Sequence, residues 1–92
     1  TVFSTAAGIV VEAKRMGGYG KCVKISHNNG YQTLYAHLSK IFVKKGDIVK
    51  DSTAIGKVGN TGFSTGCHLH YEIIKDGEKI NPEELLYKEI DN

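Results

Sequence analysis

The sequence lacks the features that mark several specialised classes of protein. Its 12 basic and 10 acidic residues leave a net charge of only +2, which argues against a dedicated nucleic-acid binder. No apolar run approaches the roughly 20 residues that a membrane-spanning helix requires, and no signal peptide is recognisable. Internal repeats and low-complexity linkers are absent too. These absences leave one small globular domain.

Cysteine is scarce as well. Cys22 and Cys67 are the only two, so the fold does not rest on a disulfide framework. We expect two free thiols, with a single bridge as the alternative. A thiolate is a good zinc ligand, but Cys67 and the adjacent His68 would point to opposite faces of a strand, which disfavours a shared site. Neither Cys67 nor Ser64 has a suitable acid–base arrangement around it, which disfavours a nucleophilic hydrolase.

What dominates the chain is alternation of apolar and polar residues with a period of two, interrupted by 11 glycines. This period predicts an all-β domain with antiparallel sheets in a sandwich or rolled arrangement. One short C-terminal helical turn is expected at 82–86, with Asn81 as N-cap and Pro82 in the first position. The expected strands and short apolar segments are 2–4, 8–15, 19–26, 31–38, 41–43, 48–49, 54–58, 68–75 and 79–80.

The clearest local prediction is a β-hairpin. Asn29-Gly30 separates the alternating runs 19–26 and 31–38, and Asn-Gly between such runs is a strong hairpin signal. Val23 and Ile25 lie two residues apart on the first of these strands, so we expect them to form a core pair.

A His-x-His pair lies on another expected strand. Side chains two residues apart share a face, so His68, His70 and Glu72 should point one way. Leu69 and Ile73 should point the other way, toward a core. Two imidazoles about 6–7 Å apart on one strand face can reach a single cavity. The pair therefore suits either one metal ligand beside a proton-transfer group or two metal ligands. The competing interpretation is two polar residues on a solvated face.

The other two histidines carry weaker signals. Alternation places His37 on the same strand face as Thr33 and Tyr35, and a lone histidine at a strand end is more often structural or solvated than functional. Tyr35 on that face is a weak candidate to add a hydroxyl to a site. His27 lies beside the hairpin turn, where we expect a structural role.

Taken together, several blocks of sequence resemble the lysostaphin/LytM-type zinc metallopeptidases. Neither a Leu-Tyr-Ala-His-Leu block nor a His-Leu-His-Tyr-Glu block is specific alone, but the two in this order and separation are. The resemblance extends from about Val2 to Pro82. The matching blocks are 17–20 (GGYG), 30–38 (GYQTLYAHL), 43–47 (VKKGD), 55–62 (IGKVGNTG), 64–72 (STGCHLHYE) and 81–82 (NP).

The resemblance implies a duplicated hybrid motif-like fold and a mechanism. Members of that family hold Zn²⁺ with a His and an Asp from an upstream motif and with the second His of the His-x-His pair, which is His70 here. His68 and His37 correspond to the two histidines that flank the metal-bound water as general base and stabiliser of the tetrahedral intermediate. Zinc lowers the pKa of such a water to about 7. The implied substrate is a peptide in peptidoglycan, and the implied location is the cell envelope, periplasmic or extracellular.

The sequence departs from the family pattern because the upstream His and Asp are absent. The chain begins with Thr1 rather than Met, and the segment 2–10 resembles the strand that follows the ligand motif. We therefore expect residues 1–92 to be a LytM-type peptidase domain truncated before that motif, because His37, His68 and His70 are all present. A naturally incomplete relative is the alternative.

Three functions stay open on the sequence. The first is the zinc endopeptidase domain. The second is a non-catalytic LytM-like module that regulates a cell-wall amidase or another envelope partner. The third is a carrier or phosphotransfer domain, which the turn at 45–49 (KGDIV) resembles, although no lysine lies at a convincing hairpin tip.

Overall fold

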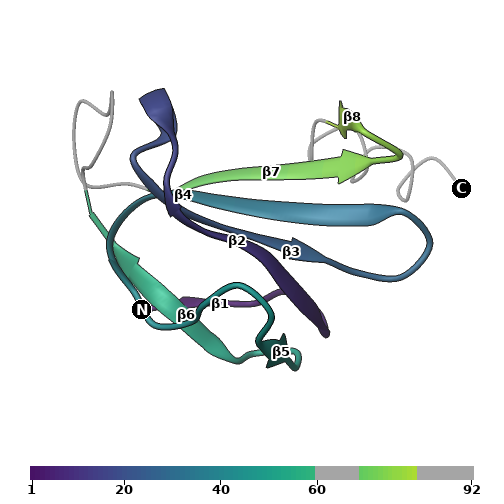
Figure 1. The fold of residues 1–92 in the computed structure, drawn as a ribbon, viewed down its shortest axis with the longest axis horizontal. Helices are drawn as coiled ribbons and strands as arrows, with labels where there is room; N and C mark the ends of the chain where they lie inside the picture. Colours follow the sequence, from purple (N-terminus) through teal and green to yellow (C-terminus); the bar gives the residue numbers. More distant parts are fainter. Residues whose placement is uncertain (60–68, 81–92) are drawn as a thin grey trace, which may run out of the picture.

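The computed structural model describes residues 1–59 and 69–80, and within them the chain is all-β (Figure 1). Every strand pairing is antiparallel, and all eight strands belong to one sheet that curls on itself, which is the rolled form of the predicted arrangement. The predicted helical turn at 82–86 lies outside the described residues. The elements are β1 (Val2–Phe3), β2 (Gly8–Arg15), the 3₁₀ turn η1 (Gly17–Tyr19), β3 (Lys21–Ser26), β4 (Tyr31–Ile41), β5 (Ile48–Val49), β6 (Ala54–Val58), β7 (His70–Lys75) and β8 (Glu78–Ile80).

The predicted hairpin is confirmed as β3 and β4. Asn29 and Gly30 both adopt positive φ, 63° and 77°, which is the conformation that asparagine and glycine tolerate best. The predicted strand over 19–26 starts two residues late, because Gly17 and Gly20 at positive φ close a turn that takes Tyr19. The predicted segment 41–43 is not a separate strand, since Ile41 is the last residue of a longer β4.

Strand β4 is the centre of the sheet because it pairs with three strands. One edge pairs with β3 over most of its length. The other edge is shared: residues 31–36 pair with β7, and residues 38–41 pair with β6. In Figure 1 β6 and β7 accordingly diverge from the point where both meet β4. His37 is the residue at which the partner of β4 changes.

The β3–β4–β7 part of the sheet buries side chains on both faces. The tyrosine face, defined by Tyr35 and Tyr71, belongs to the larger core, which also contains the predicted pair Val23 and Ile25 at 0% exposure. The opposite face carries a smaller cluster of Cys22, Leu34 and Ala36, with Met16 and Tyr19 packed against it. We call it the histidine face, because His70 pairs with Ala36 and therefore projects on the same side. The part of the chain that the structure describes has no helix long and apolar enough to cross a membrane.

Candidate active site

A β-bulge decides where His37 points. Lys21 pairs with Leu38 and Val23 pairs with Tyr35, so the single residue Cys22 lies opposite two residues of β4, Ala36 and His37. His37 takes a φ of 59°, which is uncommon for a non-glycine residue. A bulge shifts the alternation by one residue. The side chain of Leu38 consequently joins the core of the tyrosine face, and His37 leaves it.

The face predicted for His37 from strict alternation is therefore wrong. His37 does not share a face with Thr33 and Tyr35, because the extra residue of the bulge turns its ring to the histidine face. Its ring lies 5.8 Å from that of His70, centroid to centroid, with the planes at 71°. The two imidazoles thus come together from residues 33 positions apart in the chain.

The end of β6 lies beside His37. The Gly59 amide, directly after β6, donates to the carbonyl of His37 at 3.0 Å and ends the pairing of β6 with β4. A Cβ at Gly59 would lie 2.6 Å from the backbone nitrogen of Ser39, so only glycine fits without a shift of the chain. The glycine thus allows the backbone at the end of β6 to approach β4 closely, beside the residue that carries the imidazole.

The two imidazoles line a hollow of about 230 Å³ together with Gly18 and Tyr19 of η1. His37 is 8% exposed, whereas the side chain of His70 is 42% exposed. The ring of Tyr19 packs at 5.8 Å from the ring of His70. The hollow therefore has one deep and one accessible imidazole, an arrangement that can bind a cation and transfer a proton.

The carboxylate of Glu72 contacts the ring of His70. Nε2 of His70 lies 2.7 Å from Oε2 of Glu72, so the two side chains share a strand face as predicted. The hydroxyl of Tyr19 donates to the same oxygen at 3.1 Å, and Nζ of Lys79 lies 3.5 Å from it. Lys79 also donates to the hydroxyl of Tyr19 at 2.8 Å. We call these four residues the Glu72 cluster.

The Glu72 cluster keeps its carboxylate ionised. Burial raises the pKa of Glu72, but the hydrogen bonds from His70 and Tyr19 and the charge of Lys79 outweigh burial, so the net shift of the pKa is downward. The pKa of Lys79 is correspondingly raised by its hydrogen bond to Tyr19 and by the charge of Glu72. Glu72 is therefore an anion at neutral pH, and an ionised carboxylate can only accept hydrogen bonds.

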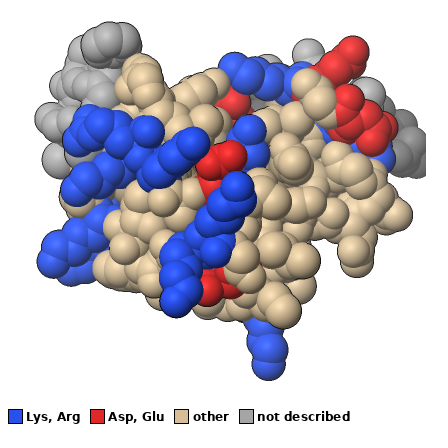
Figure 2. All heavy atoms as spheres, in the orientation of Figure 1, with Lys and Arg blue, Asp and Glu red and all other residues tan. Residues whose placement is uncertain are grey.

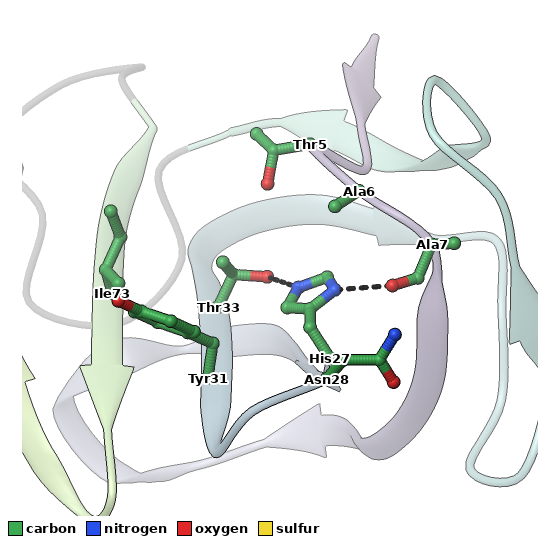
Figure 3. Close-up of a pocket in the computed structure, with 8 residues that line it drawn as sticks. All are labelled: Thr5, Ala6, Ala7, His27, Asn28, Tyr31, Thr33 and Ile73. Atoms are coloured by element: carbon green, nitrogen blue, oxygen red, sulfur yellow. Dashed lines mark hydrogen bonds between the residues drawn. The ribbon is translucent and has the colours of Figure 1, made fainter.

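A second, larger hollow of about 540 Å³ lies at the start of β4, and His27 lines it (Figure 3). Its ring is held on both sides, by the carbonyl of Ala7 at 2.7 Å from Nδ1 and by the hydroxyl of Thr33 at 2.7 Å from Nε2. Both nitrogens are thus occupied by protein, in agreement with the structural role expected for His27.

The hydroxyl of Tyr35 belongs to this second network. It accepts from Thr33 at 2.9 Å and from the amide of Thr5 at 3.2 Å, and it lies 3.0 Å from the hydroxyl of Thr5. Tyr35 is 1% exposed and packs on Tyr71. The weak prediction that Tyr35 serves the same site as His37 is therefore wrong, because the bulge separates the two side chains onto opposite faces.

The structure brings together two of the three predicted site residues. His37 and His70 share the hollow, while His68 and Cys67 lie outside the described residues. Cys22 is a free, fully buried thiol, and burial raises its pKa. Sequence reasoning assigned no role to Glu72 or Tyr19. The signals available were the position of Glu72 two residues after His70 and the place of Tyr19 in the GGYG block.

The donor set can be compared with what zinc requires. A catalytic zinc site uses three protein ligands, and no group of three His, Cys, Asp or Glu side chains forms among residues 1–59 and 69–80. His70 nevertheless has a feature typical of a metal ligand, because one of its ring nitrogens is held by a carboxylate. The described residues thus fit one ligand of a zinc site and not the whole of it.

Comparison with known proteins gives a consistent result. The sequence profile of Peptidase family M23 matches residues 1–82. The chain is 48% identical over 80 residues to the peptidoglycan DD-endopeptidase ShyA of Vibrio cholerae, covering 87% of this chain and 19% of ShyA. It is 37% identical over 91 residues to stage II sporulation protein Q of Bacillus subtilis, covering 97% of this chain and 32% of that protein.

Solved structures agree. The catalytic domain of lysostaphin from Staphylococcus simulans superimposes with a TM-score of 0.86 and 35% identity, over 94% of this chain and 69% of that one. The predicted resemblance to lysostaphin-type peptidases is confirmed. The chain spans about a fifth of the length of ShyA and about a third of the sporulation protein.

Proposed function

Because this chain belongs to peptidase family M23, we propose that it forms part of a zinc-dependent endopeptidase domain that hydrolyses peptide bonds in peptidoglycan. The observation that carries the proposal is the convergence of His37 and His70 on one hollow, from two strands and through a β-bulge. Relatives named peptidoglycan DD-endopeptidases, such as ShyA, support the substrate class.

In this proposal His70 is a zinc ligand, and the other protein ligands come from outside the described residues, from an upstream His and Asp. Bound zinc supplies a Lewis acid that polarises the peptide carbonyl and makes water nucleophilic at neutral pH. His37, deep in the hollow, accepts or returns a proton or stabilises the charge that develops on the carbonyl oxygen. Of these two roles, proton transfer and charge stabilisation, His68 takes the one that His37 does not.

The proposed location is the cell envelope, periplasmic or extracellular, where peptidoglycan is found. The charge of the chain is compatible with it. In Figure 2 lysine and arginine side chains are most numerous on the side where β6 lies, and acidic side chains are most numerous toward β8. A weakly basic surface tolerates the polyanionic polymers of an envelope.

The test is to express the protein at the full length of its gene and to measure bound zinc and peptidoglycan cleavage together. We expect about one zinc per chain after dialysis and release of soluble peptides from purified peptidoglycan. The variant Phe3→Ala, at an exposed side chain of β1, is a matched control that should keep both. A full-length protein that holds no zinc and cuts no peptidoglycan contradicts the proposal.

A second function has specific support. The chain is 38% identical to SpoIIQ in its solved complex with SpoIIIAH, with a TM-score of 0.84 over 91% of this chain and 60% of that one. Another structure of this pair is described as a pore-forming complex. A module that binds an envelope partner, without hydrolysis, is therefore the alternative. It predicts a stable complex with a partner protein and no turnover in the same full-length preparation.

A further inference from the structure

Glu72 has more partners than its position near a proposed metal ligand requires. Its side chain is only 13% exposed, although it lies on β7, one strand of the short β7–β8 hairpin. Three groups from three elements surround it: the imidazole of His70 on β7, the hydroxyl of Tyr19 on η1 and the ammonium group of Lys79 on β8. Such convergence fixes the carboxylate in one orientation.

The contact between His70 and Glu72 determines which ring nitrogen carries the proton. Oε2 of Glu72 accepts from the Tyr19 hydroxyl and lies 3.5 Å from Nζ of Lys79, so this oxygen is an acceptor and Nε2 of His70 is the donor across 2.7 Å. A neutral imidazole with a proton on Nε2 has its lone pair on Nδ1. Among the described residues no hydrogen bond to Nδ1 of His70 is formed, so this nitrogen is the one left to bind a metal ion.

Tyr19 and Lys79 complete the arrangement by holding Glu72 in place. The Tyr19 hydroxyl reaches both carboxylate oxygens, at 3.1 and 3.4 Å, and its ring packs against His70. Lys79 donates to that hydroxyl and lies 5.5 Å from the centre of the Tyr19 ring. The carboxylate therefore cannot rotate away from His70 without breaking contacts with both residues.

We propose that Glu72 is a positioning residue that holds His70 in the Nε2–H form, so that Nδ1 is its metal-binding atom, with Tyr19 and Lys79 fixing the carboxylate. The metal-binding part of this inference rests on the proposed function. The assignment of the Nε2–H tautomer does not rest on the proposed function, because it follows from contacts within the chain. The two parts can therefore fail separately.

The first experiment measures the tautomer in metal-free protein. ¹⁵N–¹H correlation spectra of the histidine rings at pH about 8, above the ordinary imidazole pKa of about 6.5, should show His70 protonated on Nε2. Glu72→Ala should give a mixture of the two tautomers, while Glu78→Ala, which removes an exposed carboxylate on β8, should leave His70 unchanged. An Nδ1–H form in the unmodified chain, or an unchanged Nε2–H form in Glu72→Ala, overturns the inference.

The second experiment measures zinc affinity of the full-length protein by chelator competition. Loss of an orienting carboxylate typically lowers metal affinity 10–100-fold, so Glu72→Ala should weaken zinc binding by about that factor. Tyr19→Phe keeps the ring and removes only the hydroxyl, and a smaller loss, below about 10-fold, is expected. This second variant also covers the case in which Glu72→Ala does not fold.

The outcomes separate the two proposals. If the unmodified protein binds zinc through His70 while Glu72→Ala and Tyr19→Phe bind it equally well, the role of Glu72 is refuted and the proposed function stands. If the Nε2–H tautomer depends on Glu72 but the full-length protein binds no zinc, the positioning contact stands and the zinc-peptidase function is refuted.

Discussion

The two faces of β4 hold histidines in opposite ways. On the side of the second hollow, His27 has both ring nitrogens engaged by protein, and the neighbouring hydroxyls of Thr33 and Tyr35 continue the same network. On the histidine face, Nε2 of His70 contacts Glu72, no other hydrogen bond to its ring forms within residues 1–59 and 69–80, and its side chain is 42% exposed. The same side chain is thus a structural link in one region and a candidate ligand in the other.

The difference shows that the type of residue matters less than which of its atoms are already occupied. A histidine with two satisfied nitrogens stabilises the fold and has no atom left for a metal ion or substrate. A histidine held on one side is oriented and still available. The bulge at His37 brings a second imidazole beside His70, because it places this ring on the histidine face and not on the tyrosine face.

The largest difference between the two faces is expected for the substitution His70→Ala in the full-length protein. We expect loss of bound zinc and of peptidoglycan cleavage, because the proposed ligand is gone. His27→Ala should keep both, since His27 lies in the other hollow. Zinc content by elemental analysis and cleavage by release of soluble peptides are the measurements. Equal loss in both variants would mean that the two histidines do not differ in function.

His37→Ala should have the next largest effect. A general acid–base group typically contributes 10²–10⁴-fold, so we expect kcat to fall by about that factor while zinc stays bound. Steady-state kinetics on a defined peptidoglycan peptide, with zinc content measured in the same sample, checks this. Loss of zinc together with activity would instead assign His37 to the metal.

Removal of the Tyr35 hydroxyl from the network around His27 and Thr33 should affect stability and not activity. In Tyr35→Phe the buried Thr33 hydroxyl loses one partner and the Thr5 amide loses another, and an unsatisfied buried group costs about 1–3 kcal/mol. Urea unfolding should show a free energy of unfolding lower by that amount. The matched substitution Tyr31→Phe, at a partly exposed tyrosine of the same strand, should cost less. Reduced kcat in Tyr35→Phe with unchanged stability would place its hydroxyl in the active site.

The smallest expected effect tests the bulge itself. A non-glycine residue at a φ of 59° costs about 1 kcal/mol, so His37→Gly should be more stable than His37→Ala by about that amount. At the adjacent Ala36, which lies in regular pairing with β7, Ala36→Gly should lower stability instead. Both pairs can be compared by thermal or urea unfolding. The same sign at both positions would argue against a left-handed conformation at His37.

The local part of the fold was predictable from the sequence because it depends on neighbouring residues. Alternation with a period of two predicted the all-β class, Asn29-Gly30 predicted the β3–β4 hairpin, and two-residue spacing placed His70 and Glu72 on one face. All three are confirmed. The predictions for His68 and for the helical turn at 82–86 stay predictions.

The site depended on tertiary structure. Alternation alone gave the wrong face for His37, because the extra residue in β4 arises where its edge passes from β7 to β6, and no short-range pattern shows that change of partner. The Glu72 cluster likewise joins η1 to the β7–β8 hairpin, and Tyr19 lies 53 positions from Glu72 in the chain. The sequence by itself determined which side chains could do chemistry. Only the pairing of distant strands decided which of them meet, because contacts between strands are set by the whole sheet and not by the residues beside each one.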